Sequence, residues 1–291
     1  MSVTEADVTS VGDLLAESAR RLERAGVPQA RRDARLLIAE ALGVRIEMVL
    51  GYPERPVTES QRRSAESLIV RRESREPISR ILGRREFWGL TFQLSPATLD
   101  PRPESETLIE VVLDSLDDRT RRLRLLDLGT GSGCLLLALL SALPKAEGLG
   151  VDIASAALET AKTNARSLGL ADRTSFVASD WGAAIAGPWD VVLCNPPYVA
   201  EGEIADLAPE VAEHEPRLAL SGGPDGFDAY RSLIPHLLHL LADDGFAALE
   251  LGAGQSETAI RLLREAGLQQ RSLHRDLAGH ERALLAARVA V

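Results

Sequence analysis

The first third of the chain repeats one pattern, in which apolar residues recur at helical spacing. The pattern covers residues 10–25, 30–42 and 58–75. Gly26 and Gly43 interrupt it, and Thr58 offers the side-chain oxygen that caps the start of a helix. We therefore predict a small N-terminal helical bundle over residues 1–84.

The pattern changes after the bundle. Aromatic residues alternate with polar ones around Gly89, which predicts a short β-hairpin. Pro101 and Pro103 then stiffen the chain before a helix that is expected to begin at about residue 105. We predict a hairpin and connector over residues 85–104.

From residue 123 onward, strand-like apolar runs alternate with helical segments. Strands are predicted at residues 123–128, 149–152, 174–178, 189–194, 245–251 and 282–287. Helices are predicted at residues 134–143, 154–168, 229–241 and 257–266. This alternation predicts an α/β domain over residues 105–291, with a mostly parallel, Rossmann-like sheet covered on both faces. Such sheets bind ligands beyond the carboxyl ends of their strands.

Composition narrows the class of protein. No apolar run approaches the roughly 20 residues of a membrane helix, and residues 1–7 are acidic and polar, unlike a signal peptide. Cys134 and Cys194 are the only cysteines, too few for a disulfide framework or a cysteine-based metal site. We expect a cytoplasmic protein with no metal and no membrane association.

The net charge of −10 is unevenly distributed. Residues 1–124 hold 21 arginines and 21 acidic residues, so the excess of acids lies entirely in the remainder. Because a long nucleic acid needs a basic surface beside the chemistry, we expect no direct nucleic-acid substrate. Several arginines are predicted on the exposed face of the third helix, as a solvated, salt-bridged face or as a docking surface for a partner: Arg62, Arg63, Arg71, Arg72 and Arg75.

The strand predicted at residues 189–194 ends in Asn195, Pro196, Pro197 and Tyr198. Proline has a fixed φ and no N–H, so the turn presents carbonyl oxygens without competing donors. The asparagine adds a side-chain acceptor and the tyrosine a flat apolar face. Two acceptors and a stacking ring suit a planar group that bears an –NH2, such as an amide or an aminopurine. We predict the catalytic and substrate-binding site at these four residues.

The three preceding strand ends predict a cofactor site. The first strand enters a glycine-rich loop whose candidate residues are Asp127, Gly129, Thr130, Gly131, Ser132 and Gly133. Cys134 replaces the third glycine of the dinucleotide fingerprint, and an acid precedes the loop, which together favour S-adenosyl-L-methionine, a cation, over a pyrophosphate.

The second and third strand ends complete this set. Asp152 is placed to accept from both ribose hydroxyls, or alternatively to cap the next helix. Asp180 is placed to accept from an adenine amino group, and Trp181 to pack on the ring or to cover the core. Asn195, at the fourth strand end, is expected to border both cofactor and acceptor.

Several segments together resemble the PrmC/HemK family of methyltransferases, which modify glutamine in peptide chain release factors. The segments are residues 85–89, 101–106, 127–133, 195–198, 215–220 with 222–223, and 250–252 with 255. The Asn-Pro-Pro-Tyr sequence alone is shared with DNA adenine methyltransferases. Residues 101–106 and 215–217 are therefore the segments that favour the PrmC/HemK family over that class. Asp100 departs from the family pattern, where an apolar residue is expected.

The resemblance implies a seven-stranded methyltransferase sheet. It also implies that the enzyme methylates N5 of the glutamine in the Gly-Gly-Gln motif of class I release factors, which act in translation termination. The cofactor product would be S-adenosyl-L-homocysteine. It further implies that the bundle docks the release factor, and we expect a monomer. No catalytic histidine is expected, and His214 is interpreted as structural. The alternatives are an adenine N6-methyltransferase acting on DNA or RNA, a non-catalytic nucleoside-binding protein and an NAD-dependent oxidoreductase.

Overall fold

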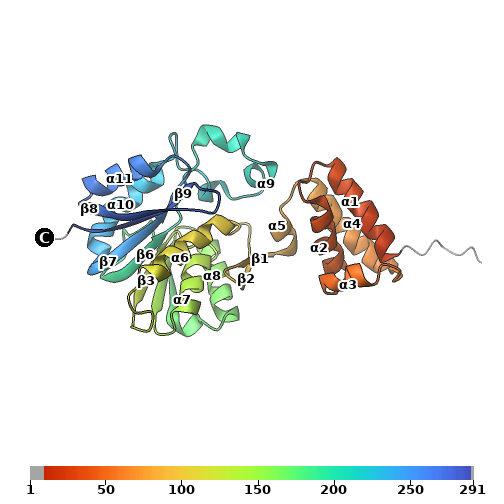
Figure 1. Ribbon diagram of the computed structural model, residues 1–291, viewed down its shortest axis with the longest axis horizontal. Coiled ribbons are helices and arrows are strands. Elements are labelled where there is room, and N and C mark those ends of the chain that lie inside the picture. The colour runs from red at the N-terminus through yellow and green to blue at the C-terminus, as the bar shows by residue number, and fades with distance from the viewer. Residues whose placement is uncertain (1–9, 290–291) are drawn as a thin grey trace, which may run out of the picture. The chain divides into compact units, whose positions relative to one another are not determined.

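The computed structural model describes residues 10–289, in two compact units (Figure 1). The first unit, here called the bundle, comprises Met1–Gly83 and the distant segment Ala208–His214. The second, the sheet domain, comprises Arg84–Leu207 and Glu215–Val291. The acidic segment 1–7 lies outside the described residues. No described helix is both long enough and apolar enough to cross a membrane.

The predicted helices of the bundle are confirmed as α1 (Val11–Arg24), α2 (Ala30–Leu42) and α4 (Glu59–Glu73). Thr58 caps α4, because its hydroxyl accepts from the Gln61 N–H. Two short helices, α3 (Ile46–Gly51) and α5 (Ile78–Leu82), were not predicted, since so few residues establish no helical period. The apolar faces of the longer helices form the core of the bundle.

Arg72 is buried, so the prediction that it lies on an exposed face is wrong. Its Nε donates to Asp33 Oδ2 at 2.8 Å and its Nη2 to Glu210 Oε1 at 3.0 Å. Arg75 also donates to the Glu210 carboxylate, at 2.7 and 2.8 Å. Burial raises the pKa of Glu210, but the hydrogen bonds from Arg75, the backbone and Arg72 outweigh it and lower this pKa to about 2. Buried charge pairs thus hold segment 208–214 within the bundle.

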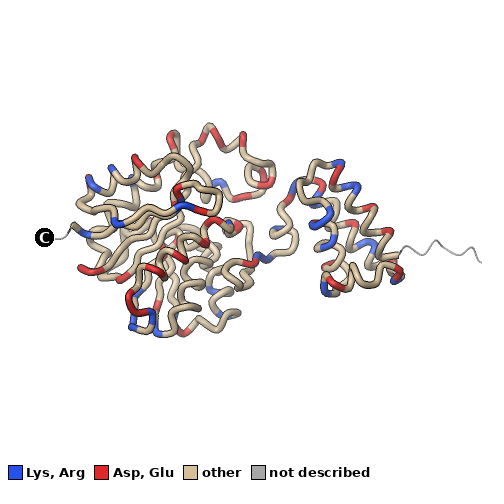
Figure 2. Tube along the Cα trace, in the orientation of Figure 1, with Lys and Arg blue, Asp and Glu red and all other residues tan. Residues whose placement is uncertain are grey.

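The remaining arginines of α4 form ion pairs nearer the surface. Arg62 and Arg63 both pair with Glu59, and Arg71 pairs with Glu76. Figure 2 shows blue and red residues interspersed over the bundle, with neither sign forming a separate face. These pairs fit the interpretation of a solvated, salt-bridged face.

Arg72→Ala is expected to lower the free energy of unfolding of the bundle by about 3–5 kcal/mol, because it leaves the buried Asp33 unpaired and removes one of the two arginines that pair with Glu210. Arg63→Ala, the matched control on the same helix, removes an exposed pair and is expected to change it by less than about 1 kcal/mol. Urea unfolding of the full chain, combined with hydrogen exchange of the α2 and α4 amides, measures both effects. Equal effects would contradict the assignment of Arg72 as the buried anchor.

The predicted hairpin and the helix after it are confirmed. Strands β1 (Arg84–Phe87) and β2 (Leu90–Gln93) pair antiparallel around a turn at Trp88 and Gly89, both with positive φ. The connector continues as a short 3-10 helix, η1 (Pro103–Ser105), and then as α6 (Glu106–Asp114).

The sheet has seven strands in the order β5-β4-β3-β6-β7-β9-β8. They are β3 (Arg124–Leu128), β4 (Glu147–Asp152), β5 (Thr174–Ala178), β6 (Trp189–Cys194), β7 (Leu241–Glu250), β8 (Leu268–Arg275) and β9 (Glu281–Arg288). Strands β3 to β7 pair in parallel, and β9 runs antiparallel to both of its neighbours. The predicted α/β class is confirmed, and β8 is the strand for which no position was predicted.

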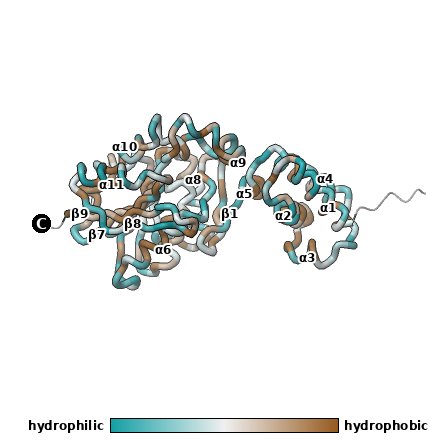
Figure 3. Tube along the Cα trace, turned by 45° about the horizontal axis from the view of Figure 1, so that its top comes forward, coloured by the Kyte–Doolittle hydropathy of each residue, from teal (hydrophilic) through white to brown (hydrophobic). Residues whose placement is uncertain are grey.

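Helices cover both faces of this sheet (Figure 1). Helices α6, α7 (Cys134–Ala142) and α8 (Ser155–Ser167) pack with Leu125 and Val191 on one face. Helices α10 (Asp228–Leu240) and α11 (Ser256–Glu265) pack with Leu126 and Val192 on the other. Successive residues of a strand point to opposite faces, so burial on both sides explains the continuous apolar runs in the sequence. Figure 3 shows brown, hydrophobic stretches in the interior of the sheet domain.

Candidate active site

The strand ends that carry the candidate residues are neighbours in the sheet. Chain order runs from β3 outward through β4 to β5 and then returns to β6 on the other side of β3. This reversal leaves a crevice beyond the carboxyl ends of β3 and β6, where ligands bind in sheets of this class. A cavity of about 520 Å³ lies there, within the size range of small-molecule sites.

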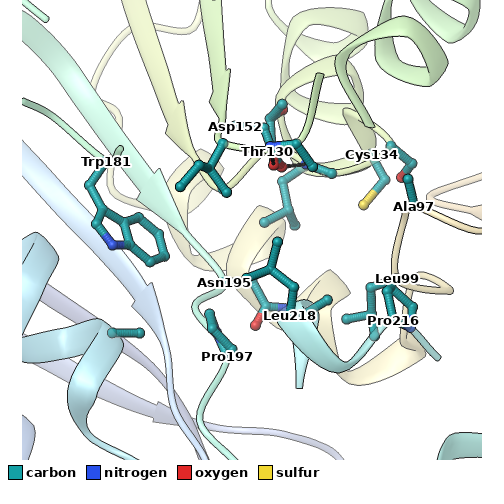
Figure 4. Close-up of a pocket in the computed structure, with 18 of the residues that line it drawn as sticks. Ala97, Leu99, Thr130, Cys134, Asp152, Trp181, Asn195, Pro197, Pro216 and Leu218 are labelled. Atoms are coloured by element: carbon teal, nitrogen blue, oxygen red, sulfur yellow. Dashed lines mark hydrogen bonds between the residues drawn. The ribbon is translucent and has the colours of Figure 1, made fainter. Parts of the chain in front are cut away.

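Most of the predicted site residues line this cavity: Gly129, Thr130, Gly131, Ser132, Asp152, Asp180, Trp181, Asn195 and Pro197. Figure 4 shows Thr130 and Asp152 together on one side, Trp181 at one end and Cys134 toward the other. Four predicted residues are not among the lining residues: Asp127, Gly133, Pro196 and Tyr198. Each of these four lies within three residues of one that does line the cavity.

Asp127 is a buried acid behind the glycine-rich loop. Thr130 donates to its Oδ2 at 2.7 Å, while its Oδ1 is buried without a hydrogen-bond partner among the described residues. Burial raises the pKa of Asp127 to about 7; the Thr130 hydrogen bond opposes the shift and the charge of Asp152 adds to it. A bound cationic group would satisfy the free oxygen and favour its ionised form.

The loop also holds Trp181 and Asp152 in place. Gly129 has φ +75°, and a Cβ there would approach the Trp181 ring to 3.3 Å, so the position favours glycine. Trp181 packs against the core beside α10 and also lines the cavity, so both of its predicted roles are compatible with its position. Asp152 accepts from the Gly131 N–H at 2.9 Å and from the Ala154 N–H at 2.8 Å. Its carboxylate therefore fixes the loop and the start of α8 while it borders the cavity.

The turn after β6 is held by its neighbours. Asn195 Nδ2 donates to Ser105 Oγ at 3.3 Å, and the Tyr198 hydroxyl donates to Glu250 Oε1 at 3.3 Å. Gln255 Nε2 donates to the Tyr198 carbonyl at 2.9 Å. Gly222 is needed for close packing, because a Cβ there would lie 2.8 Å from the Pro197 carbonyl oxygen.

The connector and residues 215–219 form another part of the cavity wall, through Pro101, Arg102, Pro216 and Leu218. Figure 4 shows Pro216 and Leu218 there, near Leu99. The buried Glu215 carboxylate joins them, since it accepts from the Asp100 N–H at 3.1 Å and from Arg102 Nη2 at 3.2 Å. The buried Asp100 carboxylate pairs with the partly exposed Arg85 at 3.7 Å, which gives this unusual acid a cationic partner.

The sequence did not single out Asp228 and Ser232 on α10, and it noted Ser105 only within segment 101–106 of the resemblance, although all three line the cavity. Glu250 was noted only as part of the resemblance, although a polar residue ending an apolar strand is the signal that located Asp127, Asp152 and Asn195. His214 is not a lining residue, and its Nε2 contacts the Ser74 carbonyl within the bundle. Among residues 10–289 there is no cluster of three or more His, Cys, Asp or Glu suited to a metal ion.

Comparison with known proteins identifies the class of this fold and site. Residues 13–83 match the PrmC N-terminal domain, and residues 104–223 match the methyltransferase small domain. The catalytic domain of hMettl16, solved in complex with the MAT2A 3′UTR hairpin 6, aligns with a TM-score of 0.54 at 19% identity, over 82% of this chain and 86% of that one. The protein is a Rossmann-like methyltransferase.

Close relatives identify the family. The chain is 49% identical over 278 residues to the release factor glutamine methyltransferase of Rhodospirillum rubrum, covering 96% of this chain and 85% of that protein. It is 46% identical over 274 residues to the release factor glutamine methyltransferase of Bradyrhizobium diazoefficiens, covering 93% of this chain and 92% of that protein. The chain therefore belongs to the family of release factor glutamine methyltransferases, and the resemblance found in the sequence is confirmed.

Proposed function

We propose that this protein uses S-adenosyl-L-methionine to methylate N5 of the glutamine side chain in the Gly-Gly-Gln motif of class I release factors, in the cytoplasm. The observation that carries the proposal is the placement of Asn195. It directly follows β6 at the crevice, and its –NH2 already donates to Ser105. Its side-chain oxygen is thereby available to accept from an amide of the substrate.

The residues around the glycine-rich loop fit the cofactor. The free, buried Oδ1 of Asp127 suits an ammonium group, and Asp152 borders the cavity with carboxylate oxygens that accept further hydrogen bonds, as ribose requires. Asp180 and Trp181 offer an acceptor and an apolar ring to adenine. S-adenosyl-L-methionine supplies an electrophilic methyl group and leaves as S-adenosyl-L-homocysteine.

The acceptor turn compensates for the weak nucleophilicity of an amide, whose nitrogen lone pair is delocalised into the carbonyl. The Asn195 side-chain oxygen and the Pro196 carbonyl accept the two N–H bonds of the glutamine amide. This fixes the nitrogen in line for attack and stabilises the positive charge that develops on it. Tyr198 lies against the plane of the amide, and no strong base is needed, because the nitrogen becomes acidic as it is alkylated.

The family and the cavity together support a protein loop as substrate. Two glycines before the glutamine make a loop thin enough to pass the wall formed by Arg102, Pro216 and Leu218, of which Leu218 is 64% exposed. The bundle is the proposed docking module for the release factor, and the active species is a monomer. Burial of Arg72 restricts any docking by arginines to the more exposed Arg62, Arg63 and Arg71.

Incubation with labelled S-adenosyl-L-methionine tests the proposal against its main alternative. The acceptors are a class I release factor, its Gln→Ala loop variant and duplex DNA. Label is expected in the intact release factor alone. Label entering the Ala variant equally would place the modified residue elsewhere, and label entering DNA would favour adenine N6-methylation.

A further inference from the structure

The acceptor turn, residues 195–198, depends on other segments to hold it in place. Its two prolines have no N–H, so the middle of the turn cannot donate a backbone hydrogen bond. At the start of the turn, Asn195 Nδ2 donates to Ser105 Oγ at 3.3 Å. At its end, the Tyr198 carbonyl accepts from Gln255 Nε2 at 2.9 Å. Gln255 is partly buried, lies directly before α11 and does not line the cavity.

Every hydrogen-bonding position of the Gln255 amide is in use. Besides the bond to Tyr198, Nε2 donates to the Gly226 carbonyl at 3.4 Å. Oε1 accepts from the Gly252 N–H at 3.1 Å and from the Tyr230 hydroxyl at 3.4 Å. A side-chain amide has two hydrogens and two oxygen lone pairs, so nothing of it is left over. The side chain thus connects the acceptor turn to the end of β7 and to the loop that contains Gly226.

Two glycines leave room for this amide and for little else. A Cβ at Gly252 would lie 2.6 Å from Gln255 Oε1, and one at Gly226 would lie 2.8 Å from Gln255 Nε2. The Cβ at Gly226 would also lie 2.6 Å from the Tyr198 carbonyl oxygen. The reverse orientation of the amide would set its –NH2 against the Gly252 N–H and its oxygen against two carbonyls. Packing and hydrogen bonding therefore determine one orientation of Gln255.

The loop that Gln255 connects to the turn is also part of the cavity wall. The N–H and carbonyl of Val199 pair with the backbone of residues 220–222, at 3.0 and 2.9 Å. Ser221, within that segment, lines the cavity. Gln255 adds a second attachment through Gly226, a few residues further along the chain. The acceptor turn and this part of the wall are therefore held together at two points.

We propose that Gln255 is a positioning residue for methyl transfer, whose –NH2 holds the Tyr198 carbonyl and so fixes the end of the acceptor turn and the wall beside it. The acceptor amide then meets the Asn195 oxygen and the Pro196 carbonyl already in place, and the reaction does not have to order them. The inference rests on the proposed function, because the position of the turn matters only if the acceptor amide binds there.

Gln255→Glu tests the proposal, because it keeps the shape of the side chain and removes the donor. An ionised carboxylate only accepts, so one of its oxygens would face the carbonyls of Tyr198 and Gly226. At about pH 8, well above the usual pKa of glutamate, the single-turnover rate at saturating cofactor is expected to fall by about 10- to 100-fold. The affinity for S-adenosyl-L-homocysteine should stay unchanged, because Gln255 does not line the cavity.

Protonation of the introduced carboxyl should restore the rate. A carboxylic acid has one O–H donor and one acceptor oxygen, which is the pattern that Tyr198 and Gly252 require. The ratio of the variant rate to the wild-type rate should therefore rise as the pH is lowered from about 8 to about 5.5, since burial beside carbonyls raises the pKa of a carboxyl. The ratio cancels titrations that the two proteins share. The titratable or charged residues that contact Gln255, its bonded partners or its neighbours in the chain are Tyr198, Tyr230, Glu250, Glu281 and Arg282.

Two further variants separate the loss of the donor from other effects. Gln255→Met keeps the length of the side chain but has neither an N–H nor a titratable group, so it should be slow at every pH. Gln269→Glu is the matched control: Gln269 lies on the edge strand β8 and donates to the Arg288 carbonyl at 3.0 Å. It undergoes the same chemical change away from the turn and should keep the wild-type rate. Unchanged affinity for S-adenosyl-L-homocysteine in each variant shows that the sheet domain is folded.

A wild-type rate in Gln255→Met, or in Gln255→Glu at about pH 8, would overturn the inference, because the donor would then be dispensable. A Gln255→Glu rate that is low and has the same ratio to wild type over the whole pH range would also overturn it, because the loss would have another cause. Failure of the proposed function is a different result, in which the wild-type protein itself leaves the release-factor glutamine unmodified.

Discussion

Asn195→Ala is expected to slow methyl transfer to the glutamine amide by about 10²- to 10³-fold, the usual loss when one preorganised polar group at the reacting centre is removed. The variant lacks the side-chain oxygen that is proposed to accept an N–H from the substrate and to stabilise the charge that develops on its nitrogen. The affinity for the cofactor should change little, because Asp152 and Trp181 in the cavity wall and Asp127 behind the glycine-rich loop remain in place. Single-turnover rates and calorimetric binding of S-adenosyl-L-homocysteine measure the two effects.

Two further variants sharpen this prediction. Asn195→Asp keeps an acceptor oxygen but loses the –NH2 that donates to Ser105, and it places a second acid in the surroundings of Glu250, so its rate should also fall. Ser232→Ala is the control, since Ser232 lines the same cavity from α10 and has no role in the proposed chemistry. Near-normal turnover of Asn195→Ala would mean that the acceptor amide binds elsewhere.

The sequence predicted the helices and strands whose hydrophobic pattern is long, or is bounded by glycine and proline. Helices α1, α2 and α4 and the parallel strands β3 to β7 were predicted within a few residues. Strand β8 was not, because its burial is low over Gln269–Arg271 and polar residues occupy much of its length. An edge strand that pairs on one side only has no strong apolar signal.

The candidate site could be predicted where single strand ends carry the chemistry. Asp152 and Asn195 each follow an apolar run, and the parallel order of the sheet brings them to one edge. Contacts between distant segments could not be predicted, because nothing local in the sequence relates Ser105 to Asn195 or Glu215 to Asp100. The burial of Arg72 was missed for the same reason, since its partners Asp33 and Glu210 lie on other elements.

Asp127→Asn is expected to weaken the binding of S-adenosyl-L-homocysteine by about 2–5 kcal/mol, or roughly 1.5 to 3.5 orders of magnitude in Kd, because the ligand's ammonium group would lose the buried anionic partner proposed for it. Burial raises the pKa of Asp127 to about 7 in the free protein, and a bound cation would lower it. Wild-type affinity should therefore decrease as the pH falls below about 7, by up to tenfold per pH unit. The Asn variant should show weak binding with no such dependence.

Asp152→Asn is the matched control for this titration. This variant should also bind S-adenosyl-L-homocysteine more weakly, because it loses a hydrogen-bond acceptor for the ribose. Its affinity should still depend on pH, but with a lower midpoint, because the charge of Asp152 contributes to the raised pKa of Asp127. Calorimetry in buffers of different ionisation enthalpy should detect proton release on binding below pH 7 in the wild type and none in Asp127→Asn.

Since a buried Asp127 disfavours folding when ionised, its replacement by asparagine should not destabilise the protein above pH 7. Weak binding could then not be attributed to unfolding. Wild-type affinity that stays constant between pH 6 and 8 would show that Asp127 does not face the cation, and the proposed place of the methionine part of the cofactor would be lost.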